Sequence, residues 1–231
     1  MDNDNTFHVG ITMAGAVSAG AFSAGFMDYL LEVMGLWEAH KEKIKYKIHA
    51  GEALSEFEKK IPLHNVCIDA IGGASAGGMV GVLAALSTFV NSKPVKEPSD
   101  SRTGNILYDS WVLLDDDSND DTFIKMLRTD DFDNNKDGIP SLLNSTPIDQ
   151  IAERVFRDFA QGRTKWQRPS YISEDLRVLV SLCSLRGVPF ELNFETFITS
   201  HFPHSPGHRM KEHMIVAHFK LKYDKEQDCD Q

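Results

Sequence analysis

The first part of the chain contains one pattern of apolar and polar positions twice. Residues 7–12 form a short apolar and β-prone run, and after a loop of small residues the segment 20–36 carries apolar side chains at spacings of three and four. The run 65–71, a glycine-rich turn and the apolar segment 79–90 repeat this order. Two consecutive strand–turn–helix units predict an α/β domain in which helices flank a parallel-type sheet.

The middle of the chain is less regular. Residues 38–60 are rich in charge and are interpreted as a roughly helical excursion into solvent. Residues 130–138 are interpreted as a polar loop. Residues 147–161 predict a helix that has Thr146 as its N-cap and Pro147 at its first position.

Strands are predicted again towards the C-terminus. Residues 176–182 and 190–194 predict a strand pair around a turn at 186–189, which contains glycine and proline. Residues 214–221 predict one more strand. A single domain across residues 1–231 accommodates these elements, since this length suits one α/β domain.

The charge balance argues against one class of partner. The chain has 24 Lys and Arg residues against 34 Asp and Glu residues, a formal net charge of −10, and no basic stripe. A nucleic-acid partner is therefore not expected. Part of the acidic excess lies at residues 115–137, where it promotes solubility.

The cysteines and the N-terminus indicate a reducing compartment. The three cysteines, Cys67, Cys183 and Cys229, are far apart and show neither a disulfide framework nor zinc-ligand spacing. Cys67 and Cys183 lie in apolar runs, which predict buried thiols. Residues 1–10 lack the basic and apolar regions of a signal peptide, and segment 79–90 is too short to span a bilayer. We therefore expect a cytoplasmic location.

The glycine-rich turn after the second predicted strand contains Ser75 in the motif G-x-S-x-G, with Gly73 and Gly77 as its glycines. The match alone is weak, but a strand before it and a helix after it are the context of a nucleophile elbow. Small residues beside the serine permit the sharp turn, and the N–H of Ala76 would face a developing oxyanion. The alternative is a strand–helix junction in which the serine has no role.

A second loop of small residues, 14–22, follows the first predicted strand. An acyl-transfer site needs backbone donors besides the N–H after the nucleophile, and they commonly come from an early strand–helix loop. A phosphate-binding loop is the rival interpretation, because Gly15 and Gly20 have the G-x-x-x-x-G spacing. Ala21 and Phe22 stand where Lys and Ser or Thr are required, which argues against nucleotide binding.

The two glycine-rich strand–helix turns, in this order, resemble those of the patatin-like phospholipases. Residues 20–25 are similar to the family's helix start, 141–148 to its later leucine–proline segment and 176–194 to its central strand pair. The resemblance implies a three-layer α/β fold of patatin-like type. It also implies hydrolysis of acyl esters of phospholipids and neutral lipids by a serine–aspartate dyad.

The resemblance implies a role for each matching position. Ser75 is the implied nucleophile, and four backbone amides are the implied oxyanion donors, those of Gly15, Ala16, Val17 and Ala76. No cofactor is implied. The implied partners are a lipid or acyl ester substrate and the periphery of a membrane.

Two features depart from the family pattern. The family loop usually reads G-G-G-x-R-G, whereas Ala16 and Val17 replace glycines and Ala19 stands at the arginine position. The family's catalytic aspartate lies in a D-G-G or D-G-A motif, which is absent, and Asp137-Gly138 comes too early. We therefore expect an N-terminal part of a catalytic domain, incomplete at its C-terminus. A non-catalytic patatin-like domain that binds lipid or protein is the alternative.

A histidine is the other candidate for the catalytic base. Five of the nine histidines lie in the C-terminal quarter, where a Ser–His–Asp hydrolase carries its histidine. They are His201, His204, His208, His213 and His218. The same group has no recognised metal-ligand spacing.

A short acidic segment resembles half of a calcium loop. Residues 133–138 fit D-x-[DN]-x-[DN]-G, with oxygen ligands at Asp133, Asn135 and Asp137. Asn144 stands where the bidentate glutamate is required. An acidic turn without metal is the alternative, and a calcium-binding module remains a further candidate function.

Overall fold

The computed structural model describes residues 5–16, 20–90, 92–113, 122–133, 142–162, 168–192 and 208–222. Its sheet has four strands in the order β1 (Thr6–Met13), β2 (Asn65–Ala74), β3 (Ile172–Leu192) and β4 (His208–Lys222). β1, β2 and β3 are parallel, whereas β4 is antiparallel to β3. The α/β class is confirmed, but the sheet is mixed rather than parallel.

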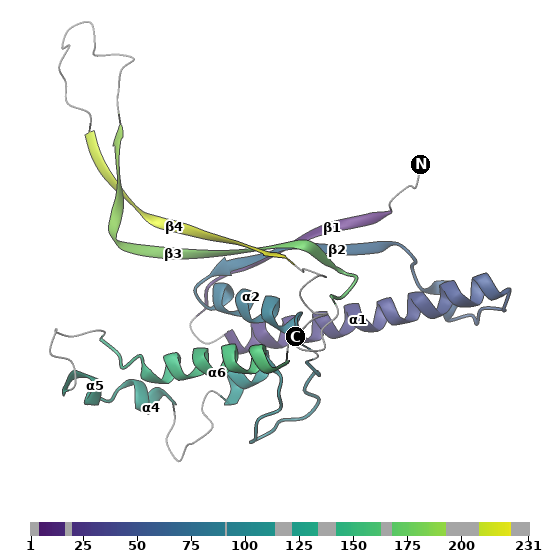
Figure 1. The fold of residues 1–231 in the computed structure, drawn as a ribbon, viewed down its shortest axis with the longest axis horizontal. Coiled ribbons are helices and arrows are strands. Elements are labelled where there is room, and N and C mark those ends of the chain that lie inside the picture. The colour runs from purple at the N-terminus through teal and green to yellow at the C-terminus, as the bar shows by residue number, and fades with distance from the viewer. Residues whose placement is uncertain are drawn as a thin grey trace, which may run out of the picture.

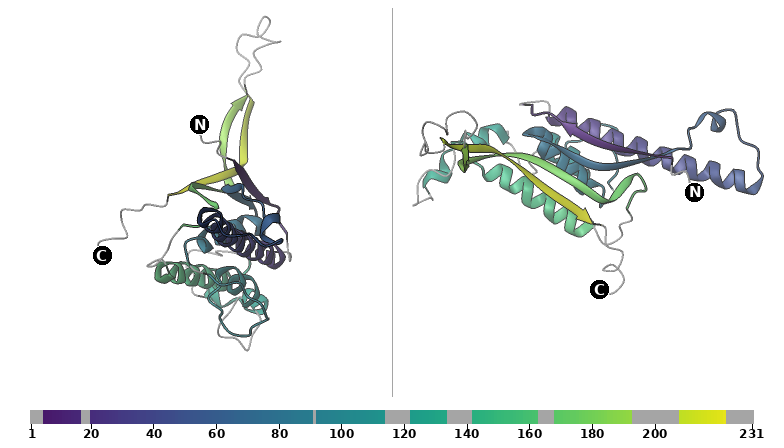
Figure 2. Two further views of the ribbon diagram at one scale, coloured as in Figure 1. Left: turned by 90° about the vertical axis from the view of Figure 1, so that its right-hand side faces the viewer. Right: turned by 90° about the horizontal axis from the view of Figure 1, so that it is seen from above.

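The main helices lie on one side of the sheet (Figures 1 and 2). α1 (Gly20–Ala50) and α2 (Ala76–Ser87) form the layer next to it, and α6 (Thr146–Gly162) lies beyond them with α4 (Thr122–Met126) and α5 (Asp130–Asp133). The other short turns are η1 (Glu58–Lys60), α3 (Ile106–Tyr108) and η2 (Asp109–Leu113). Within the described ranges the layers run sheet, helix, helix, and the opposite face of the sheet carries no helix.

The hydrophobic core lies between the sheet and its first helical layer. Ile71 and Leu176 contribute from the strands, and Met27 and Val80 contribute from α1 and α2. All four side chains are fully buried. Burial of one such side chain stabilises the fold by roughly 1.5–3 kcal/mol, so this contact fixes α2 against β2.

α1 extends beyond the predicted helix, because residues 38–50 of the charged segment continue it. Lys41 on this extension has 0% of its surface exposed. Its Nζ donates to the carbonyl of His64 at 2.9 Å and to Asn65 Oδ1 at 3.1 Å, and it pairs with Glu38 at 2.6 Å. An ammonium group is tolerated in the interior when its donors have partners. The interpretation of this segment as a solvated excursion is therefore wrong at Lys41, which ties α1 to the start of β2.

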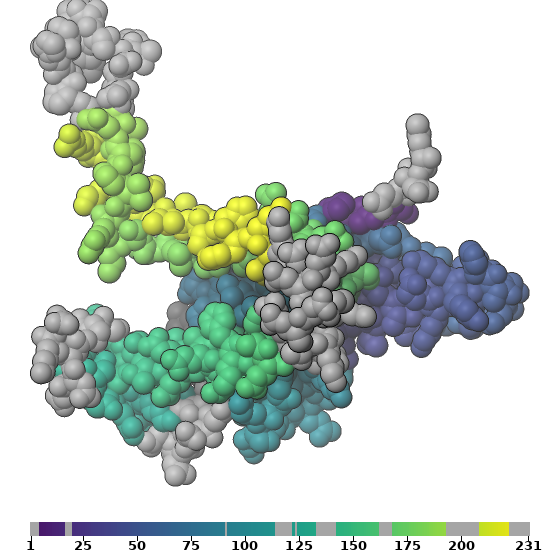
Figure 3. Space-filling view, viewed as in Figure 1, coloured from purple at the N-terminus to yellow at the C-terminus, as the bar shows by residue number. Residues whose placement is uncertain are grey.

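β3 and β4 form a long hairpin whose outer part stands clear of the helices (Figures 1 and 3). The predicted strand 176–182 and residues 190–192 of the other both belong to β3, so the predicted turn between them is wrong; residues 193 and 194 lie outside the described residues. Gly187 has a φ of 68° and the β3–β4 register shifts after Cys183, so the strand passes this point through an irregularity. Cys183 is exposed, which contradicts its predicted burial. The predicted strand 214–221 is confirmed within β4.

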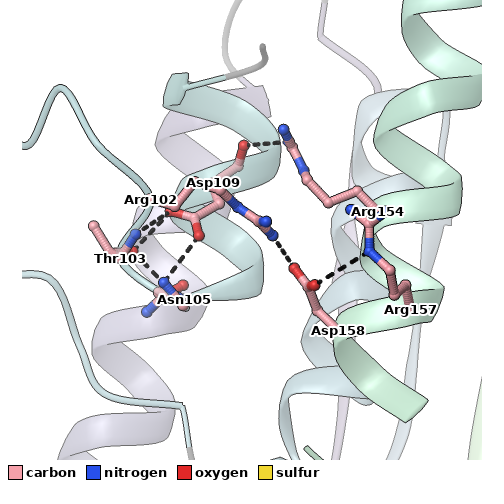
Figure 4. Close-up of polar contacts among 8 residues, drawn as sticks. Arg102, Thr103, Asn105, Asp109, Arg154, Arg157 and Asp158 are labelled. Atoms are coloured by element: carbon pink, nitrogen blue, oxygen red, sulfur yellow. Dashed lines mark hydrogen bonds and ion pairs between the residues drawn. The ribbon is translucent and has the colours of Figure 1, made fainter. Parts of the chain in front are cut away.

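A polar network holds α6 to the preceding segment (Figure 4). Arg154 Nη2 donates to the backbone oxygen of Asp109 at 2.8 Å, and Arg102 forms an ion pair with Asp158. The Asp109 carboxylate accepts from the N–H of Thr103 at 3.1 Å and from its hydroxyl at 2.7 Å. Arg154 and Asp109 are buried, so removal of either partner would leave a polar group unsatisfied in the interior.

The helical boundaries near α6 differ slightly from the prediction. Thr146 is the first residue of α6 rather than its N-cap, and its N–H donates to Asn144 Oδ1 at 3.0 Å. Asp130–Asp133 forms the helical turn α5 where a polar loop was predicted. No helix in the described part of the chain is long and apolar enough to cross a membrane.

We expect ionisation of the Tyr171 hydroxyl to lower the stability of the fold at alkaline pH. Its side chain is 8% exposed and its hydroxyl donates to the Leu31 carbonyl at 3.2 Å. Burial, assisted by the negative charge of Glu38, raises the pKa of Tyr171 from 10 to about 12. The unfolded chain therefore loses this proton first, and the stabilisation that is complete below about pH 10 is lost as the pH rises to about 12, a change of about 2–3 kcal/mol.

Tyr171→Phe is the matched variant, since it keeps the ring and removes the titrating hydroxyl. We expect its urea midpoint, followed by circular dichroism, to fall less than that of the wild type between about pH 9 and about pH 11.5. Parallel declines in the two proteins would show that Tyr171 does not carry the alkaline transition.

Candidate active site

The turn between β2 and α2 holds Ser75 in an unusual backbone conformation. Its φ is 51° and its ψ is −125°, and no other non-glycine residue in the described ranges has a positive φ. Such a conformation costs of order 1–3 kcal/mol and persists only where the surroundings impose it. Ser75 is exposed, and the strand–turn–helix context predicted for it is present.

Close packing of the backbone around two glycines, Gly73 and Gly77, holds Ser75 in this conformation. A methyl group added at Gly73 would lie 2.4 Å from the Met13 carbonyl oxygen and 2.6 Å from the Gly77 carbonyl carbon. One added at Gly77 would lie 2.4 Å from the same Met13 oxygen and 2.6 Å from the Ala14 oxygen. Since real Cβ atoms do not approach so closely, only glycine fits at either position. The end of β1 is therefore packed directly on the turn that carries Ser75.

The loop after β1 lies beside Ser75. A methyl group added at Gly15 would lie 3.1 Å from Ser75 Cβ and 3.8 Å from Ser75 Oγ. Ala16 follows in the same loop and is half-buried, and Val17 lies outside the described residues. The two predicted loops thus meet at one edge of the sheet, because β1 and β2 are parallel and both end there.

The start of α2 supplies backbone donors at this place. Ser75 is the N-cap residue of α2, and its carbonyl accepts from the N–H of Met79 at 3.0 Å. The N–H groups of the first helical turn, beginning with that of Ala76, have no intrahelical acceptor, and they carry the positive end of the helix dipole. An anionic oxygen beside Ser75 would be stabilised by these groups.

No base contacts Ser75 Oγ among the residues that the structure describes. Its side chain makes no capping hydrogen bond to α2. His208, His213 and His218 all lie on β4, which is separated from β2 by β3, so β4 is about 10 Å from β2. His201 and His204 lie outside the described residues, and a histidine base remains a prediction without support from this geometry.

The predicted calcium loop is mostly beyond what the structure describes. Asp133 is the last residue of α5, while Asn135 and Asp137 lie outside the described residues. Asn144, at the position of the missing glutamate, is buried and donates from Nδ2 to Asp130 Oδ1 at 2.9 Å. That contact gives Asn144 a structural partner, and calcium binding remains a prediction.

A second cluster of reactive side chains was not predicted. His8 on β1 and Cys67 on β2 are register partners, and Asp69 lies two residues further along β2. Asp69 Oδ2 is 2.6 Å from His8 Nδ1, and Cys67 Sγ donates to Asp69 Oδ1 at 3.5 Å. Burial, with the negative charge of Asp69, raises the pKa of the Cys67 thiol, so this sulfur is not an activated nucleophile. An aspartate inside an apolar strand was the available signal in the sequence.

Comparison with known proteins gives one similarity. No protein-family model and no solved structure matches the chain. The chain is similar to the uncharacterized protein y4iI of Sinorhizobium fredii (strain NBRC 101917 / NGR234), with 29% identity over 196 residues. The alignment covers 82% of this chain and 25% of the relative, so the chain spans about a quarter of that protein's length. The name of the relative specifies no activity.

Proposed function

We propose that this chain supplies the nucleophile and the oxyanion loop of a serine-dependent lipid acyl hydrolase of patatin-like type. The observation that carries the proposal is the strained conformation of Ser75 between β2 and α2. Glycines packed on the end of β1 maintain it, and Gly15 lies beside the serine. Nucleophile elbows of hydrolases present a serine in this way, on a strained strand-to-helix turn next to an early loop.

The proposed reaction proceeds through an acyl-serine intermediate. Ser75 Oγ attacks the carbonyl carbon of the ester while a general base takes its proton. The carbonyl oxygen becomes an oxyanion that accepts hydrogen bonds from the N–H of Ala76 and from the Gly15–Ala16 loop. Collapse of this intermediate expels the alcohol, which takes up the proton. Water, activated by the same base, then hydrolyses the acyl-serine and releases the fatty acid.

Exposed apolar side chains near this edge favour a lipid ester over a small polar one. Phe22 and Phe26 are exposed in the first two turns of α1, and Met79 is exposed in the first turn of α2. Both helices begin at the sheet edge where β1 and β2 end. An acyl chain beside Ser75 would bury part of this surface, at about 25 cal/mol per Å².

A non-catalytic domain that binds lipid is the second candidate function. The observation that favours it is the lack of any base in contact with Ser75 Oγ within the described ranges. A serine without a base is a weak nucleophile, whereas lipid binding needs only the apolar surface.

Hydrolysis of two ester classes separates these candidates. We expect the natural protein to release nitrophenol from a short-chain nitrophenyl ester and fatty acid from phospholipid vesicles, with the faster turnover on the lipid. Vesicle binding without release of either product would favour the non-catalytic domain. Hydrolysis of the short ester alone would retain the serine mechanism and contradict the lipid assignment.

A further inference from the structure

Three side chains with metal-ligating atoms lie together on the face of the sheet that the described helices leave uncovered. They are His8, Cys67 and Asp69, and one ligand atom of each lies within 4.8 Å of the others. They come from neighbouring parallel strands, with His8 directly opposite Cys67. We propose that these three residues bind a Zn²⁺ ion.

A β-bulge places Asp69 on this face. Ile68 and Ile71 are 2% and 0% exposed and both belong to the core, although they are three residues apart. Side chains of a regular strand alternate between faces, so the alternation shifts by one residue here. The β1–β2 and β2–β3 registers both skip Asp69. Without the bulge, regular alternation from Ile71 would turn Asp69 and Cys67 into the core.

The chemistry of the three ligands favours zinc over Mg²⁺ and Ca²⁺. Imidazole, thiolate and carboxylate all bind Zn²⁺, whereas Mg²⁺ and Ca²⁺ prefer oxygen ligands alone. Bonds of about 2.0–2.3 Å place tetrahedral ligand atoms roughly 3.3–3.6 Å apart, which small side-chain movements can reach from the present positions. Zinc would displace the thiol proton of Cys67 to solvent. Three protein ligands leave the fourth position for water.

The cluster is accessible to solvent, and the nearby cation has a partner of its own. The side chains of His8 and Asp69 are 62% and 39% exposed, so an ion can enter from solvent. Arg168 lies near Cys67, but its Nη2 is paired with Glu174 Oε1 at 3.0 Å. Arg168 is therefore engaged with its own partner, and the Asp69 carboxylate is the anionic ligand of the cluster.

The zinc site is separate from the proposed hydrolase site. Cys67 and Gly73 are six residues apart on β2, which corresponds to about 20 Å along the strand. An ion held by His8 and Cys67 would join β1 and β2 near the strand ends that are remote from Ser75. Its binding can therefore be measured whether or not Ser75 is catalytic.

A competition titration of Zn²⁺ against a chromophoric chelator, with the protein reduced, tests the proposal. We expect one tightly bound ion in the wild type. His8→Ala and Cys67→Ser should each weaken its affinity by about 100-fold or more, because changes outside the ligand shell already cost 10–100-fold. Co²⁺ provides a spectroscopic signature, since a thiolate-to-cobalt charge-transfer absorption is expected in the wild type and not in Cys67→Ser.

Cys183→Ser is the matched control, because it removes an exposed cysteine from another part of the sheet. We expect it to keep both the zinc affinity and the cobalt absorption of the wild type. Far-ultraviolet circular dichroism establishes that each variant is folded. The proposal is overturned if the folded wild type binds no zinc, if its affinity survives in His8→Ala or Cys67→Ser, or if its cobalt complex lacks the thiolate absorption.

Discussion

Replacement of Ser75 with alanine is expected to lower ester hydrolysis by about 10³-fold or more, because the variant lacks the Oγ atom that would form the acyl bond in the proposed reaction. The variant keeps a Cβ atom in the same turn, so the packing of Gly73 and Gly77 is retained. Measurement of kcat/KM for a short-chain nitrophenyl ester, on wild type and variant purified in parallel, checks this result. Equal rates in the two proteins would remove Ser75 from the mechanism.

The Ser75→Gly variant separates the effect of losing the hydroxyl group from the effect of relieving the backbone strain. Glycine adopts a φ of 51° without steric cost, so this variant relieves strain that serine and alanine both carry. We expect it to be as inactive as Ser75→Ala and about 1 kcal/mol more stable in urea denaturation than the wild type. A less stable Ser75→Gly would contradict the view that the fold imposes strain on this residue.

The second large effect is expected for Gly77→Ala. Its added methyl group would lie 2.4–2.7 Å from three backbone atoms of Met13 and Ala14, and backbone cannot yield as a flexible side chain can. We expect a loss of about 3 kcal/mol or more in the free energy of unfolding, at the upper end of the cost of overpacking. The rate of ester hydrolysis should fall as well, because the added methyl group would break the contact that positions the Gly15 loop beside Ser75. Urea denaturation monitored by circular dichroism measures the first effect.

Gly25→Ala is the matched control for this prediction. Gly25 also lies in a helix, but a methyl group added there would have no atom within 4 Å. Alanine is the better helix former, so Gly25→Ala should stabilise the protein by roughly 0.5–1 kcal/mol. If the two variants changed in stability by similar amounts, the close approach of β1 to the turn would not be the reason that position 77 requires glycine.

Local patterns predicted the part of the fold that surrounds Ser75. β1, β2, α2 and the first half of α1 follow from apolar runs and glycine turns, which act over few residues. The β1–α1 loop meets the Ser75 turn because two successive parallel strands end at the same edge. The order of the elements along the chain was therefore sufficient to predict that the Gly15 loop lies beside Ser75.

The features that could not be predicted from the sequence depend on contacts between segments that are far apart along the chain. Gly187 and Pro189 have the composition of a turn, yet pairing with β4 carries β3 through them. The bulge at Asp69 depends on registers with two other strands, so the cluster of His8, Cys67 and Asp69 could not be found from spacing alone. Lys41 is buried because partners at the start of β2 reach it, which a helical pattern cannot show.

Labelling with a fluorophosphonate probe tests the central claim most directly. The probe reacts with a serine that is activated in an oxyanion environment, so no substrate has to be identified first. Mass spectrometry of the digested natural protein should place the adduct on Ser75, and prior Gly77→Ala substitution should reduce it. An adduct on another serine, or none on folded protein, would contradict the assignment of Ser75 as the nucleophile.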